Sequence, residues 1–204
     1  MGRRRTMNSI YLVLDMQNDL VHADGANGKT ALGEQVAGRG VVENTARAIA
    51  GARAAGVPVA FVRVGFSENY EECPAGSPLF SGAPKAGLFR LGTWGTEIHP
   101  GLGMRPEDPL ITKHRVSPFY ATTLEPLLSA RRIGRIYCSG VSTQAVVQAA
   151  VRDGHDRDFE MIVVEDGCAA ASLEEHRNSL QSLARFCRVE TLESVLKQFG
   201  SPPA

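Results

Sequence analysis

The sequence has neither an excess of one charge nor a long apolar run. Its 204 residues carry 22 Lys and Arg against 22 Asp and Glu. This balance argues against a nucleic acid or an anionic membrane as the partner. No stretch approaches the ~20 apolar residues of a membrane span, and the apolar run at 10–14 is too short for a signal peptide. We therefore expect a cytoplasmic protein with no nucleic-acid or membrane partner.

Motifs for disulfides and metals are missing as well. The four cysteines, at positions 73, 138, 168 and 187, form no CxxC pair and have no zinc-type spacing. The five histidines have no ligand spacing either. We expect buried free thiols, no metal and no cofactor.

What the chain does have is enough apolar residues for one folded domain. It is 43% hydrophobic, and its length suits one core, since single cores extend to roughly 250 residues. We expect a single domain over residues 9–200. The run Arg3-Arg4-Arg5 is the only basic cluster, so residues 1–8 are expected to form a solvated, disordered basic tail.

Strand signals alternate with helix signals along the chain. Short apolar runs predict six strands, at residues 10–14, 57–62, 110–112, 135–138, 160–164 and 187–190. Helical spacing predicts helices at residues 41–55, 122–132, 143–153, 172–184 and 192–199. This alternation predicts an α/β fold of three layers, α/β/α, around a six-stranded parallel sheet of Rossmann-like type. Residues 65–108 are rich in Gly and Pro and have no sustained period, as is typical of a lid or binding loop.

In such sheets the ligand crevice lies beyond the carboxyl ends of the strands. Asp15 follows the first apolar run, where burial can tune its pKa, although it could simply cap a turn. Lys113 ends the third run, where it can hold a carboxylate ionised or lie along the surface. The turn at residues 140–143 (GVST) can present free N–H groups to an oxyanion, or can be a turn without chemistry.

Four segments together resemble the isochorismatase-like superfamily, also called cysteine hydrolases, over about residues 9–190. They are LDMQND at 14–19, KHRVSPF at 113–119, GVST at 140–143 and VVEDGCAA at 163–170. The resemblance implies six parallel strands flanked by helices, a small-molecule substrate, and a homodimer or homotetramer. The metal-binding branch of the superfamily has Asp-x-His after the second strand, but this chain has RVGFS at 63–67, so the resemblance also implies no metal.

The resemblance implies a catalytic Asp, Lys and Cys, of which Asp15 and Lys113 match the first two. The cysteine would stand three residues after Thr143, but that position holds Val146, which is no nucleophile. A non-proline cis peptide is implied at Val141-Ser142. The residues that we expect to bind substrate include Gln17, Val141, Ser142, Thr143 and Gln144. They also include five that could instead pack in the core or an oligomer contact, namely Phe89, Trp94, His114, Phe119 and Tyr120.

Three functions remain open from the sequence. The first is a hydrolase without an enzyme nucleophile. Resemblance to isochorismatases implies that Asp15 is the general acid of vinyl-ether cleavage in such an enzyme, and that Lys113 orients the substrate and tunes Asp15. The second is an enzyme that uses Asp15 to activate water on an amide, imide or ring carbonyl, or a non-hydrolytic enzyme. The third is a catalytically inactive relative that binds a small molecule or a partner. Because Asp15, Gln17 and Lys113 are all present, we expect an enzyme.

Overall fold

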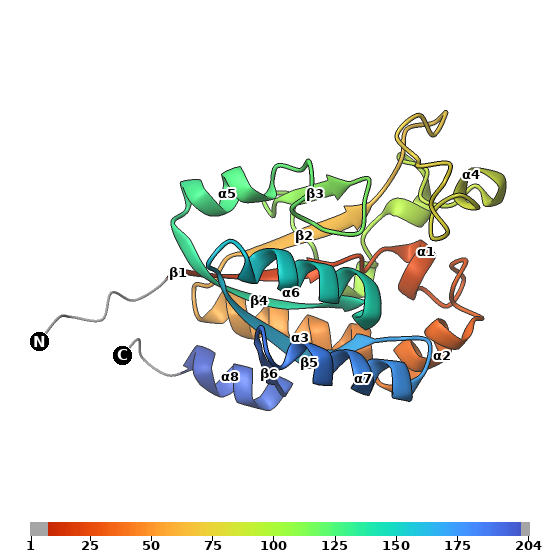
Figure 1. Cartoon of the computed structure of the whole chain (residues 1–204). Helices are drawn as coiled ribbons and strands as arrows, with labels where there is room; N and C mark the ends of the chain where they lie inside the picture. The colour runs from red at the N-terminus through yellow and green to blue at the C-terminus, as the bar shows by residue number, and fades with distance from the viewer. Residues whose placement is uncertain (1–7, 201–204) are drawn as a thin grey trace, which may run out of the picture.

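A parallel sheet organises the chain, as the alternating pattern predicts. The computed structural model describes residues 8–200, so the expected basic run Arg3-Arg4-Arg5 lies outside the described residues, and Asn8 already belongs to a strand. The strand order is β3-β2-β1-β4-β5-β6, and every pair is parallel (Figure 1). The strands are β1 (Asn8–Leu14), β2 (Val59–Val64), β3 (Leu110–Lys113), β4 (Ile133–Val141), β5 (Glu160–Ala169) and β6 (Arg188–Glu190).

Helices cover both faces of this sheet and make it the middle of three layers. One face carries α5 (Leu124–Ala130), α6 (Gln148–His155) and α7 (Leu173–Leu183). The other face carries α2 (Ala31–Gly38), α3 (Val41–Ala54) and α8 (Leu192–Gly200). The predicted α/β/α fold with a six-stranded parallel sheet is therefore confirmed.

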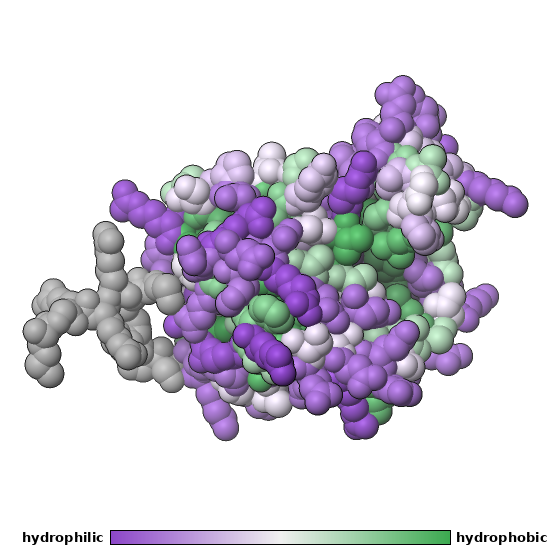
Figure 2. Space-filling model, viewed as in Figure 1, coloured by the Kyte–Doolittle hydropathy of each residue, from purple (hydrophilic) through white to green (hydrophobic). Residues whose placement is uncertain are grey.

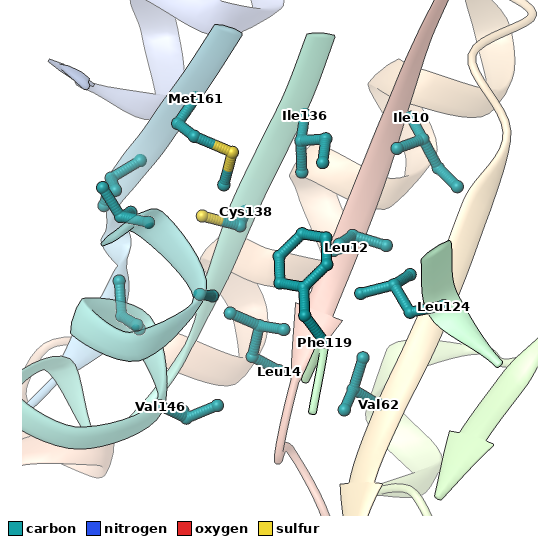
Figure 3. Packing of buried hydrophobic residues seen from close by; sticks show 14 of the residues in the cluster. Ile10, Leu12, Leu14, Val62, Phe119, Leu124, Ile136, Cys138, Val146 and Met161 are labelled. Carbon is teal, nitrogen blue, oxygen red and sulfur yellow. The ribbon is translucent and has the colours of Figure 1, made fainter. Parts of the chain in front are cut away.

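Strand β1 contributes to both halves of the core because its side chains alternate between the faces. Leu12 and Leu14 pack beneath α5 and α6, whereas Tyr11 and Val13 pack against the helices of the opposite face. All four side chains are completely buried. Figure 3 shows the half of the core beneath α5 and α6, with the ring of Phe119 among Leu12, Leu14 and their neighbours.

The long segment at 65–108 is more ordered than its sequence suggests. It contains α4 (Ala83–Ala86) and two 3-10 turns, η1 (Trp94–Thr96) and η2 (Pro100–Leu102). Phe66, Phe80 and Ala83 form a small apolar cluster of their own with the end of β2. This cluster holds the segment over the carboxyl ends of the strands, where the ligand crevice is expected.

Two helices before residue 40 had no counterpart among the sequence predictions. They are α1 (Asn18–Val21) and α2. The helix expected from residue 143 begins differently, because Thr143–Val147 (η3) is a π-type turn that continues into α6. Within residues 8–200, every helix is too short or too polar to cross a membrane.

Candidate active site

The carboxyl edge of the sheet brings Asp15 and Lys113 together. Asp15 follows β1 and Lys113 ends β3, so the whole width of β2 lies between them. Neighbouring strands are roughly 5 Å apart, which leaves about 10 Å between β1 and β3. The long side chain of Lys113 spans this gap, and its Nζ lies 2.8 Å from Asp15 Oδ2. A shorter basic side chain at this position would not reach.

The end of β2 beneath this ion pair is fastened by Gln17. The Gln17 amide donates from Nε2 to the carbonyl oxygen of Val64 at 3.0 Å and accepts from the Val64 N–H at 2.9 Å. Asp15 itself donates its N–H to the carbonyl oxygen of Val62 at 2.9 Å and has φ of 55°. Left-handed backbone is uncommon for a residue other than glycine, and here it turns the Asp15 carboxylate out of the strand. Gln17 therefore holds the end of β2, the strand that lies between Asp15 and Lys113.

The Asp15 carboxylate is buried and only half satisfied. Asp15 and Lys113 are 5% and 2% exposed. Oδ2 of Asp15 is held by Lys113, which also donates to the carbonyl oxygen of Arg115 at 3.0 Å. Oδ1 of Asp15 has no hydrogen-bond partner among the described residues. Burial raises the pKa of Asp15, and the charge and hydrogen bond of Lys113 oppose that rise without cancelling it. Asp15 is thus a buried carboxyl group with a raised pKa, one oxygen held by Lys113 and the other without a partner among the described residues.

The end of β4 and the turn that follows it form the adjoining wall. Gly140 has φ of 148°, and a Cβ there would lie 2.0 Å from the carbonyl oxygen of Leu14, so only glycine fits against β1. The next peptide, Val141-Ser142, is cis, as the family resemblance implies. The π-type turn η3 then places Val146, only 2% exposed, beside the ion pair.

A pocket of about 310 Å³ opens between these elements. Asp15, Lys113 and Val146 line its floor, and Val141, Ser142 and Ala145 line one side. The segment that carries α4 supplies an apolar roof, and the region from α1 to α2 supplies a further wall. Figure 2 shows hydrophobic residues gathered in a hollow between the α4 segment and the start of α6. The roof and wall residues are Leu79, Phe80, Leu88 and Phe89, with Leu20, Asn27 and Leu32.

Six of the residues proposed from sequence meet in this pocket. They are Asp15, Phe89, Lys113, Val141, Ser142 and Val146.

The other seven candidates lie elsewhere. Gln17 is completely buried and bonded to backbone, and Phe119 is 4% exposed and packs in the core. His114 and Tyr120 line a separate surface hollow of about 320 Å³. The remaining three are Trp94, which is 47% exposed with its ring against His22, the exposed Gln144, and the buried Thr143.

A polar network behind the pocket had no signal in the sequence. His176, in α7 and 2% exposed, lies with Nδ1 2.9 Å from Thr143 Oγ1 and Nε2 3.0 Å from a terminal nitrogen of Arg39. A guanidinium can only donate, so Nε2 accepts and Nδ1 carries the proton that it donates to Thr143. Burial, aided by the Arg39 charge, lowers the pKa of His176 to about 4. A neutral His176 therefore holds the residue that opens η3.

None of the four cysteines lines the pocket. Cys138 and Cys168 are buried in the core, and burial raises the pKa of both thiols. Cys187 is partly buried, with its thiol pKa raised to about 11. Cys73 borders the separate surface hollow, where its thiol donates to the carbonyl oxygen of Phe80 at 3.3 Å. A reactive cysteine needs a lowered pKa, and none of these environments provides one.

Metal ligands are not gathered in the part of the chain that the structure describes. No group of three or more His, Cys, Asp or Glu side chains there could hold a metal ion.

Comparisons with known proteins agree on one family. Residues 9–194 match the model of the isochorismatase domain. The isochorismatase family protein YecD of Escherichia coli O157:H7 is 35% identical over 158 residues, 76% of this chain and 81% of that protein. The ureidoacrylate amidohydrolase RutB of Methylobacterium radiotolerans is 32% identical over 96% of this chain and 82% of its own. Among solved structures, a cysteine hydrolase from Pseudomonas syringae pv. phaseolicola 1448A superposes with a TM-score of 0.84 at 22% identity, covering 96% of this chain and 94% of that one.

Proposed function

Because the chain belongs to the isochorismatase family and is a hydrolase of that family, we propose that it cleaves a C–N bond in a small molecule without an enzyme nucleophile. Asp15 is the group that moves the proton. The observation that carries this proposal is the buried, unpartnered Oδ1 of Asp15, a residue that lines a pocket whose neighbouring corner is the aliphatic Val146. The family resemblance places the cysteine nucleophile at that corner, and a valine cannot attack a carbonyl.

The proposed reaction is direct attack by water. Asp15 Oδ1 takes a proton from a water molecule as the water oxygen bonds to the substrate carbonyl carbon. The resulting tetrahedral oxyanion is stabilised by the charge of Lys113. Asp15 then gives the same proton to the substrate nitrogen, the C–N bond breaks, and a carboxylic acid and an amine leave. The raised pKa of Asp15 favours both halves of this exchange, because a general base and acid works best near the operating pH.

Vinyl-ether hydrolysis is the second candidate, and the same raised pKa of Asp15 favours it. A protonated Asp15 would donate to the terminal vinyl carbon. Water would then add to the oxocarbenium carbon and return a proton to Asp15, and the hemiketal would collapse to a carbonyl compound and an alcohol. Both candidates need the carboxyl group of Asp15 and neither needs a thiol.

The experiment compares wild type with Asp15→Asn on a panel of amides, cyclic imides and vinyl ethers. We expect Asp15→Asn to lower turnover by at least about 100-fold, the usual contribution of one acid–base group. Asp24→Asn is the matched control, since the Asp24 side chain is 85% exposed. Circular dichroism checks that each variant is folded. Equal turnover by wild type and Asp15→Asn would remove Asp15 from the mechanism, and no turnover of any compound would favour a binding protein.

Cytoplasmic location and a homodimer or homotetramer stay predictions.

A further inference from the structure

The charges that face the pocket cancel each other. Among the described residues that line it, only Asp15 and Lys113 are ionisable, and their side chains form an ion pair at 2.8 Å. Two other lining residues have polar side chains, Asn27 and Ser142. The rest of the lining is apolar, including the whole roof contributed by the α4 segment.

This arrangement disfavours an anionic ligand. A carboxylate that leaves water for an apolar wall needs a cation or several hydrogen-bond donors to replace its hydration. The Lys113 ammonium already bonds Asp15 Oδ2 and the carbonyl oxygen of Arg115. A substrate carboxylate would have to compete with Asp15 for that ammonium, and two like charges in one buried site repel each other.

We propose that the pocket takes an electrically neutral substrate, with one hydrolysable polar group and a small apolar body. Aliphatic amides and alkylureas belong to this class. The inference rests on the proposed C–N hydrolysis and narrows its substrate. The proposed substrate of this chain therefore differs in charge from that in the name of the amidohydrolase relative, because ureidoacrylate carries a carboxylate.

Leu79 is the residue where this selectivity can be tested without disturbing the core. It lines the pocket yet is 59% exposed, so it lies at the mouth. Leu79→Arg supplies the missing cation from an exposed position. Leu79→Gln removes the same apolar side chain without adding charge and is the matched control.

Two matched pairs of compounds provide the test. 4-Methylpentanamide and succinamate have the same shape and differ by an isopropyl group against a carboxylate. 5-Methyl-2-hexanone and levulinate repeat that difference in molecules that cannot be hydrolysed, so calorimetry measures their binding apart from turnover. We expect kcat/KM for 4-methylpentanamide to exceed that for succinamate by at least about 100-fold, and the ketone to bind wild type where levulinate does not.

Charge changes in the pocket should raise levulinate binding. Asp15→Asn frees Lys113 from its partner, and we expect a gain of at least about tenfold in levulinate binding relative to ketone binding. Leu79→Arg should give a similar gain and Leu79→Gln none. The neutral substrate class would be overturned if wild type bound levulinate as tightly as the ketone or more tightly, or if it did not bind the ketone. Ketone binding together with equal turnover of 4-methylpentanamide by wild type and Asp15→Asn would leave the substrate class standing and refute the proposed hydrolysis.

Discussion

Replacing Lys113 by Met leaves the Asp15 carboxylate buried without its counter-ion. Met has a similar length and no charge, so the change removes the ion pair with little loss of volume. Lys113 is 2% exposed and its Nζ lies 2.8 Å from Asp15 Oδ2. Removing one partner of a buried pair costs about 3–5 kcal/mol of unfolding free energy. A change of 1 kcal/mol shifts the melting temperature of a domain this size by about 2–4 °C, so we expect a fall of roughly 6–20 °C.

A double-mutant cycle separates this cost from a simple packing defect. Asp15→Asn alone leaves the Lys113 ammonium buried without a charged partner, so it should also destabilise the fold. The pair Asp15→Asn with Lys113→Met leaves neither charge, and we expect it to be more stable than the two single costs predict, by at least about 1 kcal/mol. Urea unfolding at pH 7, followed by circular dichroism, measures all four proteins. Strictly additive costs would show that Asp15 and Lys113 do not interact and would refute the geometry of the site.

The pH dependence of Lys113→Met provides a second measurement of the same interaction. The folded-state pKa of Asp15 is raised above its ordinary value of 3.8, and losing Lys113 removes the two effects that oppose this rise. Protonation of Asp15 therefore stabilises the folded variant, and this contribution is lost as pH rises through the raised pKa. We expect the deficit of Lys113→Met relative to wild type to be smaller at pH 5 than at pH 8. A deficit that does not change with pH would contradict a buried carboxylate at position 15.

Two further predictions concern the walls around this pair. His176 has its pKa lowered to about 4 from an ordinary 6.5, so its neutral form stabilises the fold above pH 6.5 and that contribution is lost as pH falls toward 4. The stabilisation by the neutral imidazole amounts to up to about 3 kcal/mol. The difference in unfolding free energy between wild type and His176→Asn should therefore shrink as pH falls from 6.5 toward 4. A constant difference would count against the buried neutral imidazole. Val146→Cys puts a thiol beside Lys113, where a cation lowers a thiol pKa. Iodoacetamide should modify this thiol first, as mass spectrometry can show, and should block the turnover of Val146→Cys while sparing wild type; loss of wild-type activity would instead implicate a native cysteine.

The meeting of Asp15 and Lys113 could be predicted from sequence because both follow apolar runs. In a parallel sheet the carboxyl ends of all strands lie at one edge, so polar residues just after them converge. The sequence did not contain the strand order. It therefore could not show that β2 separates the pair, or that the Gln17 amide bonds the backbone at the end of β2.

Aromatic residues near a motif were the least predictable part of the site. Phe119 follows Lys113 closely in sequence, yet it is buried under α5 and α6, because an aromatic ring fits a core as well as a pocket wall. Leu79 and Phe80, which do line the pocket, lie in a segment without periodicity, so no pattern assigned them a face. His176 lies on a helix far along the chain, and only tertiary packing brings it to Thr143.

The residue at position 146 belongs to a different connection from the ion pair. Asp15 and Lys113 are held by the ends of β1 and β3, whereas Val146 is carried by the turn between β4 and α6. A substitution at position 146 thus changes a side chain that lines the pocket beside Asp15 and Lys113, without altering the register of any strand. Under the proposed mechanism, such a scaffold passes between covalent and water-mediated catalysis by changing a single codon, and sequence divergence elsewhere need not accompany the change.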